Sequence, residues 1–338
     1  MMNMMFFPPF LFFLPNSGES DRVFTLTTTI LVSFMESPKG VQTQILPYAV
    51  IVAVVVAVAV FGLEMDETQR TAGILYISIG TIFPLIYGRM VYILLSRKRY
   101  RDLECFRIVA LIGIVQLFCA PGPFLCGLAH LLDYDPWSIA SWGMKLFAFG
   151  CRTEPPLSFV LALNRIKILC DLKYPAMIHK VLIAIILLYG CAYFGALLTP
   201  FTDFIVTPRQ HLGIYNFSLP LTVAITQTSA IVNIASMTAC LICYVIVCFY
   251  LVCKKTQIGT IKDWKAEKGI LIYAFLKFLL DVLIVIGYNY MPIPPYEWVP
   301  VFISFSYSAD MLFLPPVLYI FLNKSIRSEF FACIRASN

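Results

Sequence analysis

The chain alternates between long apolar stretches and short polar segments. A membrane-spanning helix needs about 20 mainly apolar residues. Eight stretches have about this length and character, at residues 44–63, 72–95, 107–131, 138–163, 178–199, 222–250, 267–288 and 299–322. The pattern predicts an all-α membrane protein whose core, at residues 72–322, is a seven-transmembrane helix bundle.

Lysine and arginine gather in alternate connections between these stretches. Counted from the stretch at 72–95, they occupy the first, third and fifth connections and the C-terminal tail, at Arg97, Lys98, Arg99, Arg101, Arg165, Lys167, Lys173, Lys180, Lys254, Lys255, Lys262, Lys265, Lys268, Lys324, Arg327 and Arg335. The second and sixth connections hold none, and the fourth holds only Arg209. Because cytoplasmic loops are enriched in Lys and Arg, we expect the C-terminus in the cytoplasm and the N-terminal side of the seven helices outside.

The stretch at residues 44–63 leaves two alternatives open. It is short and rich in Val and Ala, and Glu64, Asp66 and Glu67 follow it. It either spans the membrane as an additional N-terminal hydrophobic helix or is a signal-like segment that is removed. On both alternatives we expect residues 1–43 to be poorly ordered.

Composition supports a membrane protein over a soluble one. Of the 338 residues, 60% are hydrophobic and 13% are charged, and the mean hydropathy is +0.83, whereas a soluble domain carries about 25% charged residues. The net charge of +6 comes from short clusters beside apolar stretches, which argues against a nucleic-acid partner. Most of the 11 cysteines lie inside apolar stretches, where a free thiol packs as a small apolar group.

The sequence offers no catalytic or nucleotide-binding motif. It contains no glycine-rich nucleotide loop, no G-x-S-x-G and no H-E-x-x-H, and its three histidines are widely separated. Cys240 and Cys243 form a C-x-x-C, but the second pair of ligands that zinc would need is missing. We therefore expect no enzymatic activity, no cofactor and no metal site.

Two helix ends carry short motifs. The stretch at 138–163 runs into the sequence LALNR, which closes on Asn164 and Arg165, and the last stretch contains PPVLY, with Pro316 and Tyr319. In rhodopsin-like G-protein-coupled receptors, an acidic-Arg-aromatic triplet closes the third helix and an Asn-Pro-x-x-Tyr motif closes the seventh. The chain resembles this superfamily at both places. The combination is similar to the nematode serpentine chemoreceptors, nearest to their classes T and XA, over about residues 71–330.

The resemblance implies a receptor that senses a small molecule from outside and signals to a cytoplasmic heterotrimeric G-protein by helix rearrangement. Arg165 would pack against its own bundle in the inactive state and meet the G-protein in the active state. Tyr319 would swing inward as the sixth helix tilts outward. Two departures from the family pattern lie in the motifs themselves, since Asn164 replaces the acidic neighbour of Arg165, and Pro315 stands where Asn would precede Pro316.

Two further departures concern sites that such receptors often have. Gln116 stands about where an acidic residue is common in the second helix, which argues against a sodium site. Ala140 stands where the third helix usually begins with a cysteine, and the fourth connection holds no cysteine. We therefore expect the disulfide that pins this connection to be absent.

Several charged residues fall inside the predicted helices. A charge at a helix centre costs about 2.5 to 3.5 kcal/mol on insertion scales, so each needs a reason. The residues concerned are Arg152, Glu154, Lys277, Asp281 and Asp310. Lys277 and Asp281 are four apart and can face each other across one helical turn. One interpretation places Arg152, Glu154, Asp281 and Asp310 at the ligand cavity or at the switch linking it to the cytoplasmic face. The other has them pair with one another to hold the bundle together.

The same charges leave other functions open. A small transporter or channel would use them as a path for protons or ions. A receptor that no longer signals is a third alternative, because the family motifs are altered and the disulfide is missing.

The termini and loops suggest modifications and location. We expect residues 323–338 to be a cytoplasmic tail with a short amphipathic helix along the inner membrane surface, with Cys333 as a lipidation candidate. Asn216 begins an N-x-S glycosylation sequence in the fourth connection. We expect a multi-pass protein of the plasma membrane, and of a sensory cilium if the resemblance holds. Its expected partners are the bilayer, a G-protein and an unknown small molecule.

Overall fold

The computed structural model describes residues 67–175, 177–207, 213–258, 276–284 and 298–335. In chain order the elements are α3 (Glu67–Ser96), α4 (Lys98–Arg101), α5 (Glu104–Leu117), α6 (Pro121–Leu132), a 3-10 turn η2 (Pro136–Ser138), α7 (Ile139–Leu169), α8 (Met177–Leu197), β1 (Phe204–Ile205), β2 (Ile214–Tyr215), α9 (Pro220–Ile258), α11 (Trp298–Leu312), α12 (Leu314–Leu322) and α13 (Lys324–Arg335). Residues 276–284 are also helical. The segments at 1–43 and 44–63 lie outside the described residues.

The helices are long and apolar enough to cross a membrane. Among the described residues, four continuous helical stretches meet this condition by length and composition, at Glu67–Ser96, Glu104–Leu132, Met177–Leu197 and Pro220–Tyr250. The pair α11 and α12, bent by 45° at its junction, can form a fifth span. In hydrocarbon every backbone N–H and C=O must be satisfied within the segment, and a helix does this.

α7 has helices packed against it on several sides. It has 31 residues and packs against α5, α6, α8 and α9. The backbone stays helical through Pro155 and Pro156, both of which are buried. Because α7 is enclosed by other helices, Arg152 and Glu154 near its middle lie against protein rather than lipid, which is where intramembrane charges are tolerated.

The α3–α6 contact depends on glycine. A Cβ atom added at Gly127 would lie 2.7 Å from the carbonyl oxygen of Gly73 and 2.9 Å from the backbone nitrogen of Ile77. Two helix backbones approach this closely only where side chains are absent. Around this contact Tyr76, Met144 and neighbouring side chains form one buried apolar cluster, and Tyr87, Leu157 and neighbouring side chains form another.

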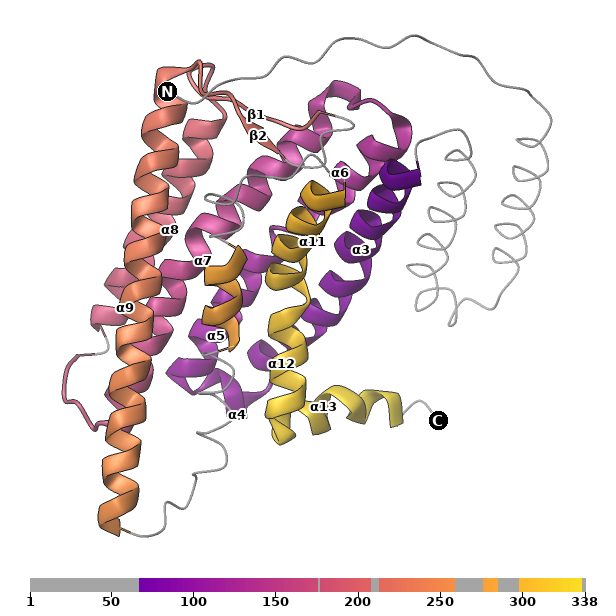
Figure 1. Ribbon diagram of the computed structural model, residues 1–338. Helices are drawn as coiled ribbons and strands as arrows, with labels where there is room; N and C mark the ends of the chain where they lie inside the picture. Colours follow the sequence, from indigo (N-terminus) through magenta and orange to yellow (C-terminus); the bar gives the residue numbers. More distant parts are fainter. Residues whose placement is uncertain (1–66, 176, 208–212, 259–275, 285–297, 336–338) are drawn as a thin grey trace. The chain divides into compact units, whose positions relative to one another are not determined.

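The bundle has two distinct ends, as Figure 1 shows. The antiparallel β1–β2 hairpin, in which Phe204 pairs with Tyr215, lies at one end beside the start of α7. The short α4 and the C-terminal α13 lie at the opposite end. We call these the outer and inner ends, following the side on which the basic loops are predicted. Helical segments are present at each of the seven predicted positions in residues 72–322, including the part of 267–288 that is described.

Candidate functional site

Four charged side chains meet inside the bundle. Lys277 Nζ lies 2.5 Å from Asp281 Oδ1, 2.6 Å from Asp310 Oδ2 and 3.9 Å from Glu154 Oε2. The Ser158 hydroxyl donates a 2.6 Å hydrogen bond to Glu154 Oε1. We call Lys277, Asp281, Asp310 and Glu154 the Lys277 cluster. One ammonium group thus connects α7, the helix at 276–284 and α11.

The Lys277 cluster is buried and has more acidic than basic groups. Glu154, Asp310 and Lys277 are 2%, 5% and 6% exposed. Three carboxyl groups lie against one ammonium group. Within the described part of the chain, Glu154 Oε2 and Asp310 Oδ1 accept no hydrogen bond. A buried acceptor left in this condition costs about 1 to 3 kcal/mol, and more when it is charged.

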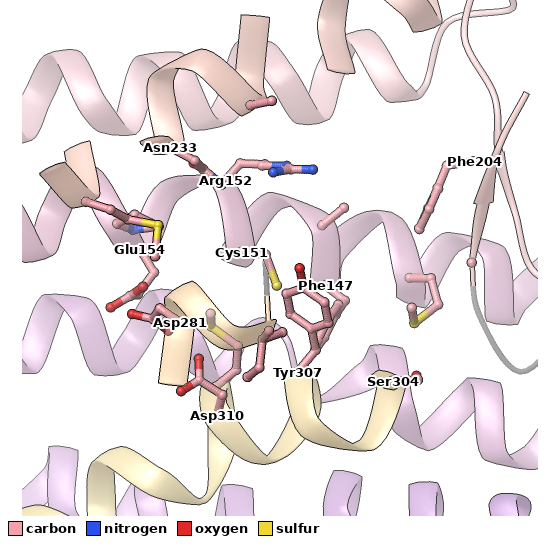
Figure 2. A pocket seen from close by; sticks show the side chains of 18 of the residues that line it. Phe147, Cys151, Arg152, Glu154, Phe204, Asn233, Asp281, Ser304, Tyr307 and Asp310 are labelled. Carbon is pink, nitrogen blue, oxygen red and sulfur yellow. The ribbon is translucent and has the colours of Figure 1, made fainter. Parts of the chain in front are cut away.

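A cavity of about 140 Å³ lies beside this cluster. Its walls come from α7, the β1–β2 hairpin, α9, the helix at 276–284 and α11. Figure 2 shows the carboxyl groups of Glu154, Asp281 and Asp310 gathered together, with the Arg152 side chain extending away from them. The apolar part of the wall includes Met144, Phe147, Phe204, Met237 and Met311. A concave, mostly apolar site with a few polar groups is the usual form of a small-molecule site.

Arg152 forms a second polar centre on the cavity wall. Its guanidinium lies beside the hydroxyl groups of Tyr193 and Tyr215, which are 2.7 Å from each other. Tyr215 belongs to β2 and also lines the cavity. Arg152 therefore connects α7 to α8 and to the hairpin that covers the outer end. Five intramembrane charges were singled out from the sequence, and four of them line the cavity: Arg152, Glu154, Asp281 and Asp310. The fifth, Lys277, pairs with the three carboxyl groups.

A smaller cavity of about 40 Å³ continues on the inner side of the cluster. Glu154, Pro155, Met237 and Asp281 border both cavities. The inner cavity is also lined by Lys277 and by three tyrosines from separate helices, Tyr87, Tyr244 and Tyr319. The Tyr87 hydroxyl donates to Gln116 Oε1, so the second-helix amide that replaces an acidic residue is hydrogen-bonded to α3.

The inner end of α7 is held by a network centred on Glu104 of α5. Asn164 Nδ2 donates to Glu104 Oε2 at 3.1 Å, and His179 Nδ1 lies 3.1 Å from Glu104 Oε1. The Tyr174 hydroxyl is 2.8 Å from His179 Nε2 and 3.2 Å from the Leu163 carbonyl. An ionised carboxylate only accepts, so His179 Nδ1 carries the proton of that contact. Burial and the nearby Glu104 carboxylate raise the pKa of Tyr174 above its ordinary value, so its hydroxyl stays protonated at neutral pH.

The predicted coupling residues lie at the same end. Arg165, on the last turns of α7, is half-buried and lies close to Tyr244 of α9. Pro315 and Pro316 are buried in the first turn of α12, where the 45° bend from α11 falls. Tyr319 is one turn further on and half-buried.

α13 packs back on the inner end of α3. Arg97 pairs with Glu329 at 2.9 Å, and the Arg89 guanidinium lies 4.8 Å from the Phe330 ring centre. Ile326 of α13 is fully buried in the apolar cluster that contains Tyr87 and Leu157. Cys333 falls within α13, but its side chain lies outside the described part of the structure.

The glycosylation candidate lies in the hairpin region of the outer end. Asn216 directly follows β2, is partly exposed, and accepts a hydrogen bond from the Ser218 backbone N–H at 3.1 Å through its Oδ1.

Several site residues had no signal in the sequence. Glu104 and His179 are separated by 75 residues, and Asn164 lies 60 residues from Glu104, so helix spacing could not join them. Tyr193 and Tyr215 read as ordinary aromatic residues of the membrane and loop. Pairs four residues apart on one helix, such as Lys277–Asp281 and Glu154–Ser158, can be found by spacing.

Comparison with known proteins identifies the fold and the family. The crystal structure of squid rhodopsin matches with a TM-score of 0.60, covering 81% of this chain and 88% of that chain at 9% sequence identity. At that identity the likeness establishes the seven-helix fold alone, and it confirms the predicted bundle. No curated protein matches the sequence. The sequence model of the family described as serpentine type 7TM GPCR chemoreceptor Srt matches residues 44–338. This match confirms the resemblance found in the motifs and favours a receptor over the transporter or channel alternative. The chain therefore belongs to the Srt family of serpentine seven-transmembrane G-protein-coupled chemoreceptors.

Proposed function

We propose that the receptor binds its small-molecule ligand in the 140 Å³ cavity and couples to a heterotrimeric G-protein through Arg165 and Tyr319. The observation that carries this proposal is the shared wall between the two cavities. Glu154 and Asp281 border the ligand cavity and also the inner cavity, and the inner cavity reaches Tyr319. A ligand that shifts these carboxyl groups changes the positions of the helices that carry Tyr319 and Arg165.

The energetic basis is a bundle with two arrangements. A ligand shifts such an equilibrium only by its differential affinity for the two states, and the G-protein at the other end shifts it by the same reciprocal coupling. The Lys277 cluster joins the third, sixth and seventh helices of the bundle through one ammonium group. Its ion pairs are therefore the contacts that a change in helix position would have to rearrange.

Glu104 supplies the carboxylate that the third-helix motif lacks. Asn164 stands where an acidic neighbour of Arg165 is expected, and its side-chain amide donates to Glu104. We assign to the Glu104 network the role of holding the inner end of α7 in the resting state.

The test is nucleotide exchange on a G-protein reconstituted with the purified receptor in lipid nanodiscs. Arg165→Ala is expected to abolish receptor-stimulated exchange while surface expression stays unchanged. Arg101→Ala, an exposed arginine of α4 at the same end, is the matched control and is expected to retain exchange. Unchanged exchange in Arg165→Ala would remove Arg165 from the coupling surface. Ion flux through proteoliposomes without a G-protein, lost on neutralising Asp281 or Asp310, would instead support a transporter.

The cellular setting follows from the same proposal. A receptor for external molecules functions in the plasma membrane, and a chemosensory one functions in a sensory cilium. Residues 72–322 form the receptor core, residues 323–338 form the cytoplasmic tail, and residues 44–63 either span the membrane or are removed. Surface biotinylation and imaging of a tagged receptor in sensory cells test the location.

A further inference from the structure

The wall of the ligand cavity contains acceptors with no donor. Glu154 Oε2 and Asp310 Oδ1 are buried, and no hydrogen-bond donor reaches either atom in the part of the chain that the structure describes. Both residues line the cavity. Buried polar atoms in folded proteins are almost always satisfied, so these two oxygens indicate a missing partner that donates hydrogen bonds.

The acidic groups of the wall indicate that the missing partner carries a positive charge. Lys277 is the ammonium group of the cluster and lies against three carboxyl groups, so the cluster has more acidic than basic groups. Arg152 extends away from the carboxyl groups (Figure 2) and lies beside the Tyr193 and Tyr215 hydroxyls. A cation in the cavity would therefore pair with a second acidic group of the cluster and donate to the open oxygens. Charge-assisted hydrogen bonds of this kind are the strong ones.

The geometry favours an organic cation over a metal ion. Among the described residues, no group of three His, Cys, Asp or Glu side chains is placed to hold a metal ion. Lys277 already occupies the position between Asp281 and Asp310. The rest of the wall is apolar, with Met144, Phe147 and Met311, and it suits a hydrocarbon body.

The volume limits the size of this body. The cavity measures about 140 Å³, and an engineered apolar cavity of roughly 150 Å³ in another protein holds benzene. A ligand of roughly five to eight non-hydrogen atoms matches that volume.

We propose that the receptor recognises small primary amines, with the ammonium group at Glu154 and Asp310 and the apolar body against Met144, Phe147 and Met311. This inference rests on the proposed function for the location of the ligand site, and it adds the chemical class of the ligand.

Direct binding to the purified receptor in nanodiscs, without any G-protein, tests the class. The probes are isobutylamine and benzylamine as chloride salts, each beside its matched alcohol and carboxylate (isobutanol and isobutyrate, benzyl alcohol and benzoate), with sodium chloride at the same ionic strength. We expect the amines to bind at least about tenfold more tightly than the alcohols and to raise the melting temperature, which the sodium salt does not do. Alcohols or carboxylates that bind as tightly as the amines, or equal stabilisation by sodium chloride, would overturn the proposal.

Variants then locate the ammonium group. Glu154→Gln retains an acceptor for Ser158 and removes a charge that makes no hydrogen bond to Lys277, so the fold should survive. We expect it to weaken amine binding about tenfold or more and to leave alcohol binding unchanged. Asp310→Asn, which also removes a direct ion-pair partner of Lys277, is the second variant, and we expect the same loss of amine binding. Glu67→Gln, an exposed carboxylate at the start of α3, is the control. Unchanged amine binding in both cavity variants would overturn the assignment.

Exchange assays separate this inference from the proposed function. Amines that bind but do not stimulate exchange on any G-protein would leave the ligand class standing and remove the proposed coupling. If a neutral or anionic compound stimulates exchange and no amine binds, the proposed coupling to the G-protein is supported and the proposed ligand class is overturned.

Discussion

Glu104 is a single carboxylate on which three segments of the inner end depend. It accepts from Asn164 of α7 and contacts His179 of α8, and Tyr174 of the connecting loop contacts His179 in turn. Hydrogen bonds to a charged group contribute about 1.5 to 3 kcal/mol, and a change of about 1.4 kcal/mol shifts a two-state equilibrium tenfold. We therefore expect Glu104→Gln to raise basal nucleotide exchange several-fold in the absence of ligand. Asp102→Asn, an exposed carboxylate two residues earlier, should leave basal exchange unchanged. Equal basal exchange in the two variants would exclude Glu104 as a resting-state contact.

Lys277 is important for stability, because its ammonium group lies against three buried carboxyl groups. Removing one partner of a buried ion pair costs about 3 to 5 kcal/mol, since an uncompensated charge is left behind. We expect Lys277→Met to lower the melting temperature of the purified receptor strongly, and the added change Asp310→Asn to restore part of the loss. Lys145→Met is the matched control, because the Lys145 ammonium lies 5.7 Å from the Trp142 ring centre and makes no ion pair within the described residues. No recovery in the double variant would mean that the cluster does not behave as coupled charges.

At the scale of elements, the α3–α6 contact depends on the absence of a side chain at Gly127. A Cβ atom there would lie 2.7 Å from the carbonyl oxygen of Gly73 on α3. A Cβ atom at Gly88, which is also on α3, would meet nothing within 4 Å. Overpacking costs about 1 to 3 kcal/mol, while Gly to Ala in a helix without a steric conflict gains up to about 1 kcal/mol. We expect Gly127→Ala to lower the melting temperature and Gly88→Ala to leave it unchanged or raise it. The opposite order would show that α3 and α6 do not pack this closely.

The elements themselves were predictable, and the contacts between them were not. Spans such as 178–199 can be read from the sequence because the bilayer requires about 20 apolar residues in helical form, and α8 lies at this position. The predicted stretch at 107–131 runs through the junction that divides the second span into α5 and α6, although Pro121, Gly122 and Pro123 mark this junction in the sequence. The Lys277–Asp281 pair follows from spacing, but the partner Asp310 is 33 residues from Lys277 and depends on how two helices are set against each other. Local rules therefore identify candidate site residues, whereas their grouping needs the fold.

At the scale of the whole molecule, the fold is retained with little shared sequence. Squid rhodopsin shares 9% of residues with this chain at a TM-score of 0.60. Bilayer thickness and backbone satisfaction fix helix length and direction without fixing side-chain identity. Interior positions such as Glu154 and Lys277 are then free to differ, which allows one bundle to serve different ligands.

The same whole-molecule view predicts the side of the membrane on which each end lies. Two N-x-S sequences fall at opposite ends of the bundle, since Asn216 follows β2 at the outer end and Asn323 lies between α12 and α13 at the inner end. Only an acceptor outside the cytoplasm can be glycosylated, and the basic connections predict that the inner end lies in the cytoplasm. We expect Ser218→Ala to abolish the mass shift that a glycosidase produces, and Ser325→Ala to leave it intact. Neither change removes the Asn216 or Asn323 side chain, whose Oδ1 atoms accept backbone hydrogen bonds. A mass shift lost only in Ser325→Ala would place α13 and the Glu104 network outside the cell, where no G-protein could reach Arg165.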